Sequence, residues 1–127
     1  MYSTLEENLE IIRVQVAERL GWRSVEYSND GYLIGYPAGR RVFAVIPSYV
    51  RDIKAAWTLV DYLSQYGIFT QVQACPMGKD GRVCRVEMTY QNKLISQTQC
   101  QTASLAICHA FLGLQGEALA CSRQREV

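Results

Sequence analysis

The chain has 127 residues, of which 49 % are hydrophobic and 20 % are charged. These values are typical of one globular domain with a real core, and they exclude a disordered or fibrous protein. Thirteen Lys and Arg nearly balance twelve Asp and Glu. No overall charge therefore attracts the protein to nucleic acid or to an anionic membrane.

The N-terminal segment carries Glu6 and Glu7, whereas a signal peptide begins with basic residues. No apolar run approaches the length of about 18 residues that a membrane helix needs. We therefore expect a cytoplasmic protein without a membrane partner.

The cysteines form an odd set without a C-x-x-C pair, which fits neither a disulfide framework nor a zinc site. We predict reduced thiols that act as small apolar side chains, with no metal and no cofactor bound. The five are Cys75, Cys84, Cys100, Cys108 and Cys121.

The first segment reads as a helix over about residues 4–20. Two overlapping capping boxes begin it, Ser3-x-x-Glu6 and Thr4-x-x-Glu7, and Gly21 ends it. Its apolar residues recur at helical spacing. They are Leu5, Leu9, Ile12, Val16 and Leu20.

A strand hairpin follows, with strands at 24–28 and 32–36 around the turn Asn29-Asp30-Gly31. A third strand is predicted at 42–46, because this run is β-branched and aromatic and Pro47 ends it.

A second helix is predicted over about residues 50–66, with Gly67 at its end. The helical period places five residues on its inner face, and Trp57 is the largest of them. They are Ile53, Ala56, Trp57, Val60 and Leu63.

Three more strands are predicted at 68–74, 82–90 and 93–99, the last a polar edge strand. The middle strand alternates apolar with polar residues, which predicts one buried face and one solvent-exposed face. Its apolar residues are Cys84, Val86, Met88 and Tyr90. Thr102 caps a third helix that runs to about Leu114.

This order predicts an α+β protein. We expect a three-layer α-β-α sandwich with three helices and one mainly antiparallel sheet of five to six strands. Helices on both faces would cover the apolar surfaces of such a sheet. The expected organisation is a single α/β domain over residues 1–115 with a flexible tail at 116–127.

Three segments occur in an order that resembles the phage ABA sandwich domain family. They are Gly21-Trp22, the run Asp52-Ile53-Lys54-Ala55-Ala56-Trp57, and the run Thr102-Ala103-Ser104-Leu105-Ala106-Ile107-Cys108. The resemblance covers about residues 8–114. It implies an α-β-α fold and a phage or prophage protein in a bacterial host cell, and it implies no activity.

The chain departs from the family pattern at three places. Val50-Arg51 stands where members have Ser-Thr, so we expect Ser48 to cap the second helix. Ser104 replaces a frequent proline, and His109 replaces a basic residue.

An enzyme is disfavoured, because the single histidine, His109, falls on the face of its helix away from the core. We find no nucleophile elbow, no zinc-protease motif and no phosphate-binding glycine loop. Asp52, Asp61 and Glu87 remain as acids or bases for the alternative, a small enzyme acting on a nucleotide or similar metabolite.

A second alternative is a double-stranded RNA-binding module, since the second half of the chain has the order α-β-β-β-α. Such a module needs lysines at the start of its last helix. Here Thr102-Ala103-Ser104-Leu105-Ala106 carries no positive charge, which makes nucleic acid a poor candidate partner.

The best candidate site combines tyrosines and arginines before the second helix. Guanidinium groups bind carboxylate or phosphate, and tyrosines offer flat surfaces for contact. We predict a non-enzymatic phage or prophage accessory protein that binds a protein partner or a small anionic, nucleotide-like ligand, and that self-associates as a homo-oligomer. The site residues are Tyr36, Arg40, Arg41, Tyr49 and Arg51, with Tyr32 nearby.

Overall fold

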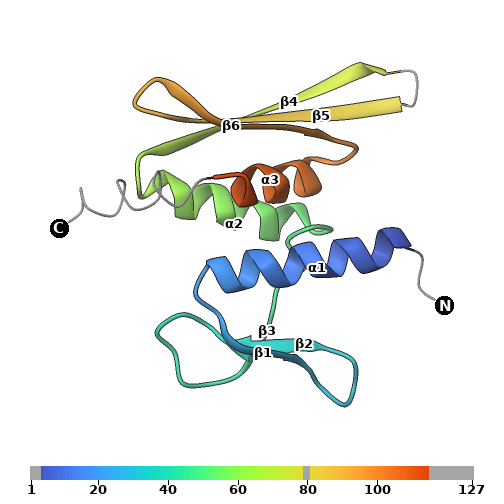
Figure 1. Cartoon of the computed structure of the whole chain (residues 1–127), viewed down its shortest axis with the longest axis vertical. Helices are drawn as coiled ribbons and strands as arrows, with labels where there is room; N and C mark the ends of the chain where they lie inside the picture. The colour runs from blue at the N-terminus through green and yellow to red at the C-terminus, as the bar shows by residue number, and fades with distance from the viewer. Residues whose placement is uncertain (1–3, 79–80, 115–127) are drawn as a thin grey trace. The chain divides into compact units, whose positions relative to one another are not determined.

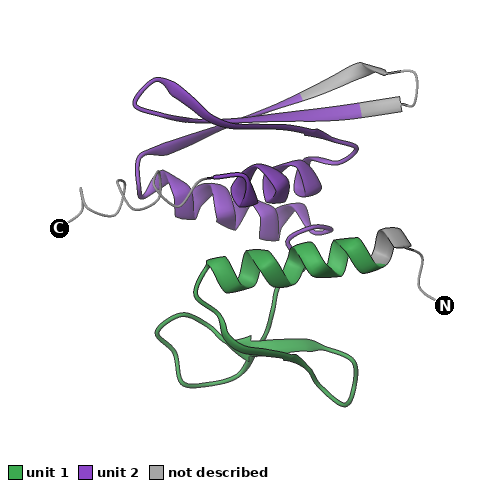
Figure 2. Ribbon diagram, in the orientation of Figure 1, with its two compact units in different colours: residues 1–48 green, residues 49–127 purple. Residues whose placement is uncertain are grey.

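The computed structural model describes residues 4–78 and 81–114, and its described part contains three helices and six strands in the predicted order (Figure 1). The chain divides into two compact units, residues 1–48 and 49–127 (Figure 2). A single folding domain over 1–115 stays a prediction. The expected tail at 116–127 lies outside the described residues.

In unit 1, helix α1 spans Thr4–Arg19. Gly21 terminates it, as the sequence predicted. The Gly21 N–H donates to the Glu18 carbonyl at 3.0 Å and the Trp22 N–H donates to the Ala17 carbonyl at 3.1 Å. This pair of bonds is a Schellman motif, which requires a left-handed residue. Gly21 supplies it with φ +99°.

The predicted hairpin consists of β1 (Arg23–Tyr27) and β2 (Leu33–Tyr36), which pair antiparallel. Its turn is closed by the Ser28 N–H, which donates to the Tyr32 carbonyl at 2.7 Å. Strand β3 (Ala44–Val45) pairs with the other edge of β2 and is shorter than the predicted third strand.

In unit 2, helix α2 (Ile53–Ser64) begins after Asp52 and not after Ser48. The Asp52 carboxylate accepts the Lys54 N–H at 3.0 Å, and its own backbone is extended. The prediction that Ser48 caps this helix was therefore wrong. Asp52 lies directly before the first helical residue and can reach the free N–H groups of the first turn.

The buried face of α2 also differs from the prediction. Leu59 and Leu63 are fully buried, with Ala55 and Ala56 beside them, whereas Trp57 is 44 % exposed. Both faces of this helix carry apolar residues, so the helical period alone does not decide which face is inside. Our placement of Trp57 in the core was wrong.

The second sheet of the chain is antiparallel, with β5 (Gly81–Tyr90) between β4 (Ile68–Gly78) and β6 (Lys93–Cys100). Gln91 and Asn92 join β5 to β6, both with positive φ. Two such residues form the tight turn that matches the twist of a hairpin. The predicted polar edge strand is β6. Residues 79 and 80, between β4 and β5, lie outside the described part.

Helix α3 (Ala103–Leu112) has Thr102 as its N-cap, as predicted, with the Thr102 hydroxyl accepting the Leu105 N–H at 3.2 Å. The Ser96 hydroxyl of β6 donates to the Ala110 carbonyl at 2.7 Å. This bond holds the end of α3 against the sheet.

The six strands form two sheets of three and not the single predicted sheet of five to six. In unit 2, α2 and α3 contact each other and lie on the same side of the β4–β5–β6 sheet (Figure 1). Val86 and Met88 face them and are fully buried, while Phe69 on the opposite face is 67 % exposed. Within unit 2 both helices thus lie on one face of the sheet. The alternation of apolar and polar residues predicted for strand 82–90 agrees with one buried face and one exposed face.

Gly21 offers a first test of the fold. A methyl group at Gly21 would meet the Ala38 Cβ at 3.0 Å and would carry the unfavourable φ of +99°. We expect Gly21→Ala to lower the free energy of unfolding by about 1–3 kcal/mol, measured by urea denaturation. Gly39→Ala is the matched control, because Gly39 has φ +74° but open space around it. Equal losses in the two variants would contradict the close approach at Ala38.

The buried face of α2 gives a second prediction. Leu59→Ala should destabilise the protein by about 2–5 kcal/mol, because it removes a fully buried side chain and leaves a cavity. Trp57→Ala should cost much less, since nearly half of that side chain is already exposed. Urea denaturation of both variants checks this, and a larger loss for Trp57→Ala would reverse the assignment of the helix face.

Candidate functional site

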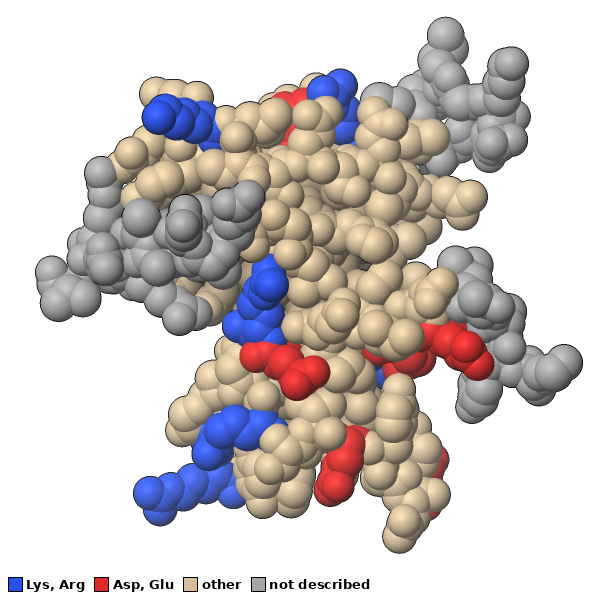
Figure 3. Space-filling view, in the orientation of Figure 1, with Lys and Arg blue, Asp and Glu red and all other residues tan. Residues whose placement is uncertain are grey.

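The predicted arginines lie in the loop 37–43 between β2 and β3, which we call the arginine loop. Arg40 and Arg41 are both exposed. In Figure 3, blue side chains project from this loop at the lower left of the molecule. Among the residues that the structure describes, neither guanidinium has a carboxylate partner.

The arginine loop is fixed at both of its ends. The rings of Tyr36 and Phe43 stack with centroids 3.9 Å apart, which holds the two ends together. The Arg40 N–H donates to the Pro37 carbonyl at 3.0 Å, so the loop begins with a tight turn. The structure therefore orders the backbone that carries both arginines.

Arg23 is a third anchor of this loop, and sequence reasoning missed it. It lies opposite Tyr36 in the register of β1 and β2, and its guanidinium lies 5.7 Å from the centre of the Tyr36 ring. The same group donates to the Arg40 carbonyl at 2.7 Å. Counting the hairpin register outward from the Asn29-Asp30-Gly31 turn would have placed Ser24 opposite Tyr36. A register shift between Arg23 and Glu26, where Ser24 has φ +54°, brings Arg23 there, and the sequence carries no signal for this shift.

Apolar side chains surround the arginine loop without being covered. Val42 is 74 % exposed, and Phe43 and Val45 are each about half exposed. Tyr32, at the other end of the hairpin, is 61 % exposed. The combination of two arginines with exposed aliphatic and aromatic surface is the composition of a protein interface centre.

The other two predicted residues, Tyr49 and Arg51, belong to unit 2. Arg51 is exposed, whereas Tyr49 is 4 % exposed and so offers little ring surface to a ligand. They precede α2, where the Asp52 carboxylate already accepts the Lys54 N–H. A second anion at that helix end would meet this negative charge. A shared role for these two residues and the arginine loop stays a prediction.

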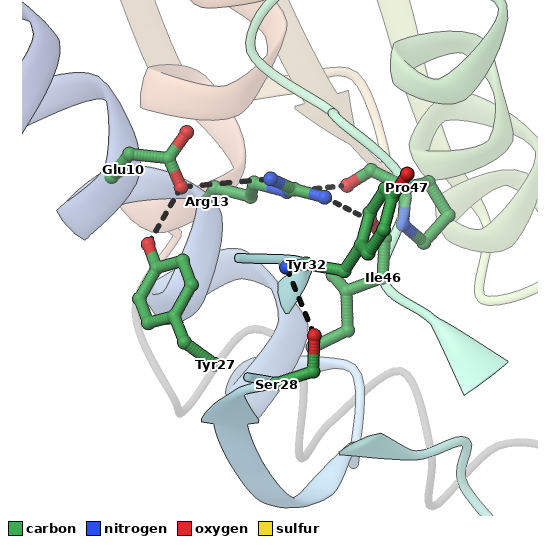
Figure 4. A network of polar contacts seen from close by, with 7 residues as sticks. All are labelled: Glu10, Arg13, Tyr27, Ser28, Tyr32, Ile46 and Pro47. Carbon is green, nitrogen blue, oxygen red and sulfur yellow. Dashed lines mark hydrogen bonds and ion pairs between the residues drawn. The ribbon is translucent and has the colours of Figure 1, made fainter. Parts of the chain in front are cut away.

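Unit 1 is held together by a polar network around Arg13 of α1 (Figure 4). Arg13 donates to the Ile46 carbonyl and, at 3.2 Å, to the Pro47 carbonyl. Glu10 accepts the Tyr27 hydroxyl at 2.8 Å and lies 3.5 Å from the Arg13 guanidinium. The network thus connects α1 to β1 and to the chain that leaves β3.

The three carboxylates that the sequence offered as catalytic acids or bases do not form a catalytic group. Two of them have structural roles, and the third is exposed on a helix. Asp52 caps α2, and Glu87 pairs with Arg85 at 3.0 Å. Asp61 and His109 are exposed on two different helices. In the described part of the chain, no three His, Cys, Asp or Glu residues lie together as a metal site would require.

The comparison with known families decides what kind of protein this is. The family model of the phage ABA sandwich domain matches residues 15–112. The chain belongs to this family. No curated protein and no solved structure matches it. The resemblance noted at the three sequence motifs is thereby confirmed, and the α+β arrangement of this phage ABA sandwich domain agrees with the family's name.

Within the described ranges of this phage ABA sandwich domain, no helix is both long and apolar enough to cross a membrane.

The Arg13 network generates a third prediction. Arg13→Met keeps much of the side-chain volume but leaves the Ile46 and Pro47 carbonyls without their donor. We expect a loss of about 2 kcal/mol in the free energy of unfolding, because hydrogen bonds from charged donors contribute about 1.5–3 kcal/mol. Glu10→Gln is the control. It removes an ion pair but keeps an oxygen for Tyr27, and it should cost well under half as much.

Chemical denaturation of the two variants, followed by circular dichroism, measures this difference. A loss for Glu10→Gln as large as that for Arg13→Met would show that the ion pair, and not the two carbonyl contacts, stabilises unit 1.

Proposed function

We propose that this phage ABA sandwich domain acts by binding a partner protein, and that the arginine loop with its surrounding apolar side chains is the contact surface. The observation that carries the proposal is that the loop is fixed by three anchors while its arginines and Val42 remain exposed. Ordering a loop before binding reduces the entropy lost on association.

The chemistry of this surface specifies its partner. Arg40 and Arg41 favour carboxylates, which guanidinium groups bind with two parallel hydrogen bonds. Val42, Phe43 and Val45 favour an apolar patch beside those carboxylates, because burying exposed aliphatic surface is favourable. The expected partner is therefore a protein with an acidic cluster next to exposed apolar residues.

A small anion would use the arginines but not the neighbouring apolar residues, and so it explains less of the surface. For this reason we place the protein partner before the nucleotide-like ligand.

Self-association is the other interaction that the sequence suggested, and it has a separate candidate surface. The face of the β4–β5–β6 sheet opposite the helices carries Phe69 and Leu94, which both lie beside Thr89 in the strand register. Phe69 is 67 % and Leu94 is 53 % exposed. Light scattering on the purified protein measures the oligomeric state directly.

The fourth prediction tests the arginine loop. Immobilised wild-type protein and the double variant Arg40→Ala/Arg41→Ala are compared in pull-downs from lysate of a phage-infected bacterial host. We expect proteins that bind the wild type to be lost from the variant, and their binding to weaken as salt is raised. The melting temperature should change little, because exposed charges contribute little to stability.

Lys54→Ala/Lys93→Ala is the matched control. It removes the same charge from two exposed positions of unit 2 and should retain the bound proteins. Thermal-shift measurements with nucleotides and inorganic phosphate form the second arm. Retention of the same proteins by the Arg40/Arg41 variant would overturn the proposed surface, and an arginine-dependent shift with a nucleotide alone would replace the protein partner with a small ligand.

A further inference from the structure

Two of the cysteines face one another across a pair of strands. Cys84 of β5 and Cys100 of β6 are register partners in the antiparallel ladder. The ladder is regular here, with each of the neighbouring pairs, Arg85 with Gln99 and Val86 with Thr98, also directly opposite. Side chains at opposite positions of a ladder point to the same face of the sheet.

The spacing of such a pair suits a disulfide. Directly opposite residues of an antiparallel pair have Cα atoms about 4.5–5.5 Å apart, and disulfides join Cα atoms about 4.4–6.8 Å apart. Both thiols are free in the structure, and both side chains are partly exposed. A small reagent can therefore reach them without unfolding the sheet.

A third cysteine, Cys108 of α3, lies close enough for its pKa to respond to Cys100. Burial, with a smaller contribution from Cys100, raises the pKa of Cys108 to about 12. Cys108 is fully buried, so it is both inaccessible and protonated at neutral pH. Burial also raises the pKa of Cys100, against an opposing effect of the Thr98 hydroxyl, which lies 3.9 Å from its sulfur.

We propose that Cys84 and Cys100 form a redox-sensitive cross-strand dithiol, which closes reversibly to a disulfide on reaction with small-molecule disulfides of the glutathione class. One thiol loses its proton and its thiolate attacks the reagent, which releases one reagent thiol and leaves a mixed disulfide. The second protein thiolate then attacks the protein sulfur of that mixed disulfide and releases the second reagent thiol. The protein loses two electrons and two protons, which reduce one reagent disulfide to two thiols.

This inference does not depend on the proposed binding surface, because both cysteines belong to unit 2. It also agrees with reduced thiols in a reducing cytosol, where the pair stays open until the balance of small thiols and disulfides changes. Closure would link β5 to β6, the strand that leads into α3.

The fifth prediction tests this pair. The full chain carrying Cys75→Ser/Cys121→Ser, which leaves Cys84, Cys100 and Cys108, is reduced and then incubated with oxidised glutathione. Intact mass spectrometry should show the loss of two hydrogen atoms, and peptide mapping should place the bond between Cys84 and Cys100. Adding Cys108→Ser should leave this outcome unchanged, whereas adding Cys84→Ser or Cys100→Ser should stop the reaction at one bound glutathione.

The rate of closure should increase between pH 7 and pH 9. The reaction needs thiolate, and the raised pKa of Cys100 keeps this group protonated at neutral pH. Phenylarsine oxide, which bridges two neighbouring thiols, is the second probe. It should bind in one equivalent and be lost with either single replacement.

A disulfide that includes Cys108, a glutathione adduct that persists on the protein with both cysteines present, or no reaction at pH 9 would each overturn the proposal. Iodoacetamide labelling without denaturant shows that each variant is folded, because Cys108 should react only after unfolding. A variant that labels at Cys108 is replaced by the corresponding alanine variant.

Discussion

The contacts of Arg13 are the interaction on which unit 1 depends. Strand β3 has only two residues, so its ladder with β2 alone is a weak attachment for the segment that follows. The Ile46 N–H donates to the Leu33 carbonyl at 2.9 Å, and Arg13 adds a second attachment by donating to two successive carbonyls at Ile46 and Pro47. The same guanidinium pairs with Glu10, which accepts the hydroxyl of Tyr27. One side chain thus fixes α1 to both ends of a small sheet, which then presents the arginine loop.

Unit 2 is stabilised differently, by apolar burial on one side of its sheet. Val86 and Met88 face α2 and α3, and the opposite face keeps the Arg85–Glu87 ion pair. This arrangement places the side chains of β5 in two environments that alternate along the strand. Cys84 shares the helix-facing side with Val86, and the regular ladder sets it opposite Cys100. The dithiol therefore follows from the same register that builds the core.

The residues of the candidate site were chosen from the sequence, and their geometry came only from the structure. Arg40 and Arg41 follow a tyrosine-bearing hairpin in the sequence, and the structure places them in an ordered, exposed loop. Arg23 was missed because a register shift between Arg23 and Glu26, which no turn residue signals, brings it opposite Tyr36. Tyr49 was predicted from composition alone, and its burial depends on packing that composition does not encode.

The sequence by itself determined the order of helices and strands, the hairpin turns, the Thr102 cap and the end of α1 at Gly21, because each depends on residues within one or two turns of chain. Only the tertiary structure decided how the six strands divide into two sheets and that Leu59, and not Trp57, faces the core of α2. Strand pairing and the choice of a buried helix face depend on residues far apart in the chain. A period of 3.6 or 2 residues identifies the faces of an element, and only its neighbours determine which face is covered.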